Sequence, residues 1–133
     1  FLPNGDTKEE RKMIDETRKI LDLPNLAVTA TCVRVPVLNG HSVAINVELE
    51  NAFELQDILD ALAKQEGIRL MRDAYPTPLD ASGQDEVFVG RVRRDDSIPN
   101  GLHLWVVADN IRKGAAANAI QIVQKLEEER HVI

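Results

Sequence analysis

The stretch TATCVRVPVLNGHSVAINVELE, residues 29–50, decides how we expect the chain to fold. Residues 26–37 are mostly β-branched or small and carry no helical stripe, so they predict a β-strand. The Leu-Asn-Gly turn at 38–40 follows, and Asn and Gly accept positive φ angles at little cost. The stretch therefore predicts a hairpin whose second strand runs to residue 50.

Arg34 precedes the predicted reversal and His41 follows it directly. Strand side chains alternate, so the valines on either side of Arg34 can fill a core that the guanidinium cannot enter unpaired. A guanidinium on a strand can grip a carboxylate with two parallel hydrogen bonds, and an imidazole exchanges protons near neutral pH. The pair indicates an anion clamp beside an acid/base group. On spacing alone we favour the simpler interpretation, an edge-strand charge and a turn histidine.

Composition excludes several classes of protein. The 133 residues suffice for one domain that buries a core without disulfides or metal. A formal net charge of −6 argues against a nucleic-acid surface. One cysteine permits no intrachain disulfide and no Cys/His metal spacing, so we expect no metal. Without a long apolar run or a secretory signal pattern, we expect a soluble cytoplasmic protein that is not bound to a membrane.

Periodicity predicts the helices. Thr-Lys-Glu-Glu at 7–10 has capping-box spacing, and Asp-Leu-Pro-Asn at 22–25 should end the helix that begins there. Apolar residues at i, i+3, i+4 and i+7 from Leu55 predict an amphipathic helix closed by Gly67 as its C-cap. The pair at 109–110, Asp-Asn, can cap a last helix that contains a run of small residues.

Three further strands are predicted at 68–71, 86–93 and 102–108. A loop with two prolines, residues 74–83, separates the first two of them. We expect His103 to be a strand-face residue and Trp105 a core or dimer contact. The predicted order is helix, two strands, helix, three strands, helix. This order indicates an α+β fold with helices packed on a mixed, largely antiparallel sheet.

Two strings resemble one known family. Cys-Val-Arg-Val-Pro-Val at 32–37, followed by Gly-His-Ser at 40–42, resembles the substrate-site segment of aspartate-β-semialdehyde dehydrogenases. Asp-Asn-Ile-Arg-Lys-Gly-Ala-Ala at 109–116 resembles the family's C-terminal segment. The resemblance implies that residues 1–133 are one C-terminal domain, like that of glyceraldehyde-3-phosphate dehydrogenase, which binds substrate and forms a homodimer. It also implies that the family's N-terminal NADP-binding domain and nucleophile segment are absent.

The family that the chain resembles interconverts aspartate β-semialdehyde plus phosphate with β-aspartyl phosphate, using NADP(H) and a cysteine thioester, in lysine, threonine and methionine biosynthesis. The resemblance implies a role for each of five residues: acid/base group for His41, clamp on the substrate carboxylate for Arg34, partner of the substrate ammonium for Glu9, phosphate contact for Lys12, and nicotinamide-cofactor contact for Asn110. Without it, Glu9 and Lys12 are simply a solvated helix pair. Close helix packing explains the segment of Asn110 equally well.

Cys32 is not expected to be the nucleophile, because a reactive thiolate needs an electropositive, partly open place rather than the interior of a strand. We therefore expect the chain to have no dehydrogenase activity by itself while belonging to a protein that has it. The alternatives are a stand-alone amino-acid-binding module and a pure dimerisation module. Reductases of N-acetylated glutamyl phosphate are a same-class alternative, although their substrate has no free ammonium for Glu9 to bind.

Overall fold

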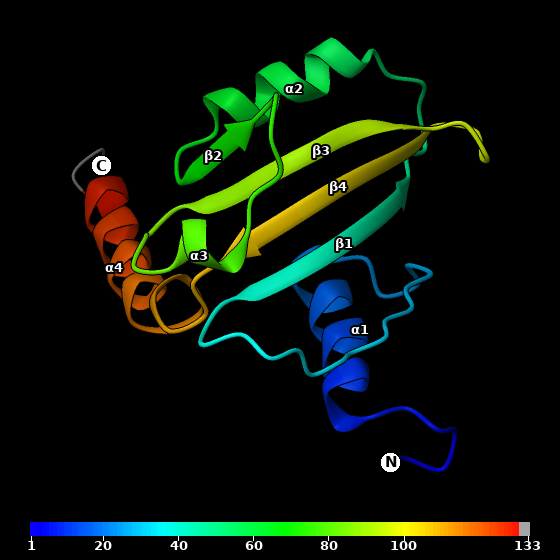
Figure 1. Cartoon of the computed structure of the whole chain (residues 1–133), viewed down its shortest axis with the longest axis horizontal. Coiled ribbons are helices and arrows are strands. Elements are labelled where there is room, and N and C mark those ends of the chain that lie inside the picture. Colours follow the sequence, from blue (N-terminus) through cyan, green and yellow to red (C-terminus); the bar gives the residue numbers. More distant parts are fainter. Residues whose placement is uncertain (131–133) are drawn as a thin grey trace. The chain divides into compact units, whose positions relative to one another are not determined.

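A computed structural model describes residues 1–130 of the chain (Figure 1). The chain divides into two compact units, Phe1–Pro36 and Val37–Ile133. The first contains one helix. The second contains a four-stranded sheet and the remaining helices.

The first unit begins with the predicted helix, α1 (Lys8–Ile20). The capping box is present, because the Thr7 hydroxyl accepts from the Glu10 N–H at 3.1 Å and the Glu10 carboxylate accepts from the Thr7 N–H at 2.6 Å. Each residue thereby satisfies a backbone donor that the first helical turn leaves free. Leu21 is the C-cap, and Asp22 at a φ of 54° turns the chain out of the helix. The predicted start and end of this helix are confirmed.

The strand predicted over residues 26–37 is wrong, since this segment forms no strand. Its β-branched composition shows that it would fit a pleated surface, but a strand also needs a partner for its backbone. The Cys32 N–H donates instead to the Glu10 carboxylate at 2.8 Å, and Pro36 has no N–H to donate. The predicted hairpin therefore does not form, and there is one strand before the second helix rather than two.

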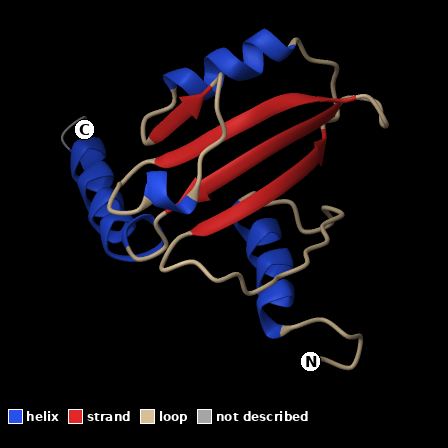
Figure 2. Cartoon of the chain, in the orientation of Figure 1, coloured by secondary structure: helices blue, strands red, loops and turns tan. Residues whose placement is uncertain are grey.

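The sheet of the second unit has the order β1-β4-β3-β2 (Figure 2). Its strands are β1 (His41–Glu48), β2 (Ile68–Met71), β3 (Val87–Asp95) and β4 (Gly101–Ala108). The β1-β4 and β3-β4 pairs are antiparallel, whereas β2 pairs with β3 in parallel. The expected mixed, largely antiparallel sheet is confirmed. His41 begins β1, whose antiparallel partner is the distant β4.

The helices of the second unit differ in detail from the prediction. Helix α2 (Leu55–Lys64) lies beside β2 (Figure 1), and its C-cap is Gln65. Gly67, predicted as the cap, lies two residues further on at a φ of 78°, where the chain turns into β2. A one-turn helix, α3 (Pro78–Ala81), occupies the predicted loop. Thr77 and Asp80 form a second capping box at its start, and that spacing is readable in the sequence.

The last predicted helix is present, with a π-turn at its start. The turn η1 (Arg112–Ala116) leads into α4 (Ala117–Arg130). The Asp109 carboxylate accepts from the backbone N–H groups of residues 111 and 112, which is the capping role expected of it. Among the described residues, none of the helices combines the length and apolar composition needed to cross a bilayer.

The core of the second unit lies between the sheet and the segment that precedes β3. Ala81 and Val107 are fully buried and Phe88 is 3% exposed, with Met71 and Trp105 packed against them. The indole N–H of Trp105 donates to the Pro76 carbonyl at 2.8 Å, which satisfies the polar end of this side chain. Trp105 is therefore a core contact, one of the two roles expected for it.

Gly90 allows the chain around Pro76 to approach the sheet. A Cβ at Gly90 would lie 2.6 Å from Cδ of Pro76 and 3.1 Å from the Ala74 carbonyl oxygen. Because Pro76 is itself fully buried, its ring has little room to move. We expect Gly90→Ala to lower the free energy of unfolding by about 1–3 kcal/mol, as overpacking does.

Urea denaturation followed by circular dichroism checks this expectation. The matched control is Gly114→Ala in η1, where an added Cβ meets no atom within 4 Å. This control should leave the stability unchanged or raise it by up to about 1 kcal/mol, because alanine favours helix over glycine. Equal effects of the two substitutions would contradict the close approach at Gly90.

Candidate functional site

The five candidate residues are divided between the two units. Glu9, Lys12 and Arg34 belong to the first unit, and His41 and Asn110 to the second. The structure brings members of each set together.

Glu9 and Lys12 lie on one face of α1, as their spacing predicts. The Lys12 Nζ lies 3.4 Å from Glu9 Oε1, and the two side chains are 55% and 60% exposed, respectively. A pair this open to water is held weakly. Both charges are therefore accessible to a ligand that offers a better partner.

Arg34 is exposed and lies two residues after Cys32, whose backbone is held by a hydrogen bond. The Cys32 N–H donates to Glu10 Oε1 at 2.8 Å, while Glu10 Oε2 accepts from the Thr7 N–H. These bonds, first that of Thr7 and then that of Cys32, lower the pKa of the Glu10 carboxyl. A single buried carboxylate thus ties the segment of Arg34 to the helix of Glu9 and Lys12.

Glu10 is a residue that sequence reasoning only partly identified. The Thr-x-x-Glu spacing predicts its bond to Thr7. Its second partner, Cys32, lies 22 residues away in a segment that was expected to be a strand. No local pattern connects the two.

The thiol of Cys32 is half-buried, with its Sγ 3.4 Å from Sδ of Met13. Burial raises the pKa of this thiol, and the charges of Glu10 and Glu9 raise it further. A raised pKa keeps the sulfur protonated at neutral pH, and a thiol is a poor nucleophile. Cys32 does not lie in a strand, but these surroundings argue against a nucleophilic role for it.

In the second unit, His41 and Asn110 come to the same edge of the sheet. His41 is exposed and pairs with Ala108 in the β1-β4 ladder. The preceding residue, Gly40, has a φ of 95°, and its N–H donates to Asn110 Oδ1 at 2.8 Å. The amide of Asn110 is therefore bonded to the residue next to His41. Its Nδ2 donates no hydrogen bond within residues 1–130.

Asp109 is the second residue that sequence reasoning only partly identified. It is 3% exposed, and its Oδ2 accepts from the Gly83 N–H at 2.8 Å and from Asn39 Nδ2 at 3.1 Å. The bond from the Gly83 N–H, and after it the capping bonds from residues 111 and 112, lower the pKa of the carboxyl. Sequence spacing predicts the cap but not the partners 26 and 70 residues away.

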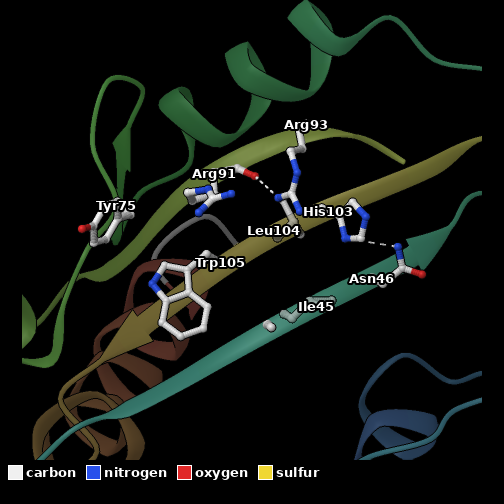
Figure 3. Close-up of a pocket in the computed structure, with 9 residues that line it drawn as sticks. Ile45, Asn46, Tyr75, Arg91, Arg93, His103, Leu104 and Trp105 are labelled. Carbon is white, nitrogen blue, oxygen red and sulfur yellow. Dashed lines mark hydrogen bonds between the residues drawn. The ribbon is translucent and has the colours of Figure 1, made fainter. Parts of the chain in front are cut away.

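A separate hollow of about 500 Å³ lies on the sheet (Figure 3). Its lining comprises Ala44, Ile45, Asn46, Tyr75, Arg91, Arg93, His103, Leu104 and Trp105. His103 is a strand-face residue, as expected, and its Nδ1 lies 3.4 Å from Asn46 Nδ2. None of the five candidate residues lines this hollow.

One extra residue in β3 shapes the hollow. Gly90 pairs with Trp105 and Arg93 with His103, so the register shifts between them, and Arg91 adopts a φ of 54°. Beside the hollow, Asp95 accepts hydrogen bonds from Ser97 and Asn46. These bonds, chiefly the one from the Ser97 hydroxyl, lower the pKa of Asp95 to about 2.

No group of three or more His, Cys, Asp or Glu side chains in the described part of the chain is arranged to hold a metal ion. Among the five candidate residues, the first unit contains a guanidinium, an ammonium and a carboxylate, and the second contains an imidazole and a side-chain amide. A guanidinium and an ammonium can bind anions, a carboxylate can bind an ammonium, and an imidazole can exchange protons.

Comparison with known proteins identifies the family. The family model described as "Semialdehyde dehydrogenase, dimerisation domain" matches residues 1–113. The chain belongs to this family. The resemblance noted in the two sequence strings is thereby confirmed.

Members of the semialdehyde dehydrogenase family are close in sequence to the chain. "Aspartate-semialdehyde dehydrogenase 2" of Vibrio cholerae is 52% identical over 128 residues, which are 95% of this chain and 38% of that protein. The aspartate-semialdehyde dehydrogenase of Aquifex aeolicus is 48% identical over 133 residues, 97% of this chain and 39% of that protein. The chain thus spans about 38% of the length of the curated relatives it matches.

Solved structures of this family confirm the fold class. Aspartate semialdehyde dehydrogenase II of Vibrio cholerae, in a complex with ASA, matches with a TM-score of 0.91 and 50% identity over 96% of this chain and 39% of that one. The Candida albicans enzyme with NADP matches with a TM-score of 0.77 and 26% identity over 96% of this chain and 44% of that one. The α+β domain is shared despite the lower identity.

The tie between Glu10 and Cys32 can be followed by NMR. We expect the backbone amide resonances of Thr7 and Cys32 to shift together as the Glu10 carboxyl titrates, at a pKa below the ordinary glutamate value. Because the folded-state pKa is lowered, the stability that this carboxylate contributes is present above the unfolded pKa. This contribution to stability is lost as the pH falls through the folded-state pKa.

A ¹⁵N-edited pH titration measures this coupling. Glu10→Gln should abolish the shared transition, and Glu16→Gln, an exposed substitution on the same helix, should leave it intact. A Cys32 amide that does not follow the Glu10 titration would contradict the tie.

Proposed function

We propose that the chain is the substrate-binding and dimerisation domain of an aspartate-semialdehyde dehydrogenase. The observation that carries the proposal is the bond from the Gly40 N–H to Asn110 Oδ1. It joins the two strings that resemble this enzyme family, at residues 32–42 and 109–116. Support for the substrate also comes from the Vibrio cholerae relative, whose solved structure is a complex with ASA.

The proposed reaction converts aspartate β-semialdehyde and phosphate into β-aspartyl phosphate. Oxidation of the aldehyde carbon to the acyl level releases a proton and a hydride. NADP, when bound, accepts the hydride. The acyl group passes through a thioester on a cysteine outside this chain, and phosphate oxygen then forms the new bond to carbon as the C–S bond breaks.

His41 would take the proton released when the aldehyde is oxidised, because an imidazole can accept a proton near neutral pH. Its position on the first residue of β1 supports this role, since the strand holds its backbone while the side chain stays exposed. Arg34 would hold the α-carboxylate of the substrate with two hydrogen bonds. Its guanidinium is exposed.

Glu9 and Lys12 would hold the substrate ammonium and the phosphate, respectively. In the structure the two side chains pair with each other in water at 3.4 Å. Because an exposed pair is weak, the two ligands can replace it at little cost. A lysine is also suited to phosphate as a point charge. The pair would thus open readily as the ligands bind.

The residues near His41 fit an amide-bearing cofactor. Asn110 uses its Oδ1 on the Gly40 N–H, which leaves the Nδ2 hydrogens able to donate to a carbonyl group such as that of a nicotinamide. Asn110 would thereby orient the nicotinamide end of NADP. Most of the cofactor would be bound by the N-terminal domain of the full protein, as in the family.

For the full protein, we propose that residues 1–133 form its C-terminal domain and that two copies associate. The pathway would be the biosynthesis of lysine, threonine and methionine, in the cytoplasm.

The first test compares the activity of the full-length protein with that of the isolated chain. We expect the full-length protein to reduce NADP when given aspartate semialdehyde and phosphate, and the isolated chain to show no turnover. The reason is that the chain supplies substrate contacts and an acid/base group but no activated thiolate. Absorbance at the NADPH band measures both rates.

Any of three results would count against the proposal. Turnover by the isolated chain would contradict the assignment of the nucleophile. A full-length protein that binds aspartate-like ligands but reduces no NADP would favour an amino-acid-binding module, and one that only dimerises would favour a pure dimerisation module.

Arg34 gives a sharper test of substrate binding. Arg34→Lys keeps the charge but loses the planar fork, so we expect KM for the semialdehyde to rise about 10- to 100-fold with a smaller change in kcat. Steady-state kinetics of the full-length protein measure both constants. Arg11→Lys is the control, since Arg11 is an exposed residue of α1 that pairs with Asp15. A KM equally insensitive to both substitutions would remove Arg34 from the substrate site.

A further inference from the structure

Two successive residues just after β4 hold two successive residues just before β1. Asp109 Oδ2 accepts from Asn39 Nδ2 at 3.1 Å, and Asn110 Oδ1 accepts from the Gly40 N–H at 2.8 Å. His41 follows at once and pairs with Ala108. Three consecutive residues that lead to the imidazole are therefore held in place. Asn39 is held through its side chain, Gly40 through its backbone N–H and His41 through its pairing with Ala108.

The surroundings of residue 109 require a carboxylate side chain. The groups around it all donate hydrogen bonds: the N–H groups of Gly83, Ile111 and Arg112 and the Nδ2 of Asn39. An ionised carboxylate accepts at both oxygens, whereas an asparagine has one accepting oxygen and one donating nitrogen. Asp109→Asn would turn a donor toward two of these donors inside a site that is only 3% exposed.

The segment before His41 has little freedom of its own. Gly40 has a φ of 95°, and a Cβ there would lie 3.4 Å from both the Ala108 carbonyl oxygen and Cβ of Pro78. Asn39 also donates to the Ser82 hydroxyl at 3.1 Å. These contacts, together with the bond from Asn39 to Asp109, fix the position of residues 39 and 40. A displacement of about 1 Å at a reacting group can cost on the order of 100-fold in rate.

We propose that Asp109 is a positioning residue that sets the place of the His41 imidazole by holding Asn39. The inference rests on the proposed function, in which His41 exchanges protons with the substrate. Asp109 itself touches neither substrate nor cofactor in this account. Its effect on the reaction passes through the turn at residues 39 and 40.

The first test is Asp109→Asn in the full-length protein. We expect kcat to fall about 10- to 100-fold. KM for the semialdehyde and for phosphate should stay within about twofold, because Arg34, Glu9 and Lys12 keep their surroundings. Asp85→Asn is the matched control, since Asp85 pairs with the Arg112 guanidinium at 2.7 Å and does not touch the turn before His41. It should keep kcat within about twofold of the unsubstituted enzyme.

A double-mutant cycle separates positioning from general loss of structure. If Asp109 acts through His41, adding Asp109→Asn to His41→Ala should lower kcat by less than about twofold. A general loss of active protein would multiply the two effects. Multiplicative losses, or an Asp109→Asn enzyme within twofold of the unsubstituted one, would overturn the proposal.

Asn39→Ala provides the second variant if Asp109→Asn does not fold. It removes the bond to Asp109 but leaves the buried carboxylate with its three backbone donors. We expect a smaller fall in kcat, about 5- to 20-fold, which again disappears on the His41→Ala background. An unchanged kcat in a folded Asn39→Ala enzyme would overturn the proposal.

Amide hydrogen exchange at Gly40 distinguishes failure of this inference from failure of the proposed function. In full-length protein, protection of the Gly40 N–H should fall about tenfold or more with Asn39→Ala and remain unchanged with Asp85→Asn. An unsubstituted protein without dehydrogenase activity would contradict the proposed function, while this measurement would still decide whether Asp109 holds the turn. Equal Gly40 protection in all three proteins would overturn the inference.

Discussion

The pairing of β1 with β4 is the constraint on which the second unit depends. The ladder fixes His41 opposite Ala108, so the residues that follow β4 meet those that precede β1. A ladder of this kind satisfies the backbone groups of both strands and leaves no freedom to slide, because a one-residue slip would move every side chain to the other face. The contacts of Asn39 and Gly40 with Asp109 and Asn110 are consequences of this register.

Each unit uses one buried carboxylate in the same way. Glu10 accepts from two backbone N–H groups in the first unit, and Asp109 accepts from three in the second. In both, the carboxylate accepts from local helix-capping N–H groups and from at least one group far away in the sequence. A charged acceptor makes stronger bonds than a neutral one, so a single side chain can begin a helix and also hold a distant segment. The candidate residues follow closely after the points held in this way.

Local sequence patterns were sufficient to predict the helices and strands that local interactions specify. The Thr7 capping box, the apolar repeat from Leu55 and the alternating strands at residues 68–71, 86–93 and 102–108 all appear near their predicted places. The strand at 26–37 failed because β-branched residues do not specify a partner. Resemblance supplied the candidate site residues, whereas Asp109 and Glu10 acquire their longer-range contacts only in the folded chain.

The extra residue in β3 decides which face of the sheet the residues after it occupy. With it, Arg93 stands opposite His103 and Arg94 opposite Leu102. A regular ladder continued from Gly90 with no residue removed would place Val92 opposite His103, and Arg93 would move to the opposite side of the sheet. Deleting one of the two residues between Gly90 and Arg93 would give a regular ladder that keeps Arg93 opposite His103. The irregularity therefore lets this strand lose one residue at that place without turning over the side chains that follow.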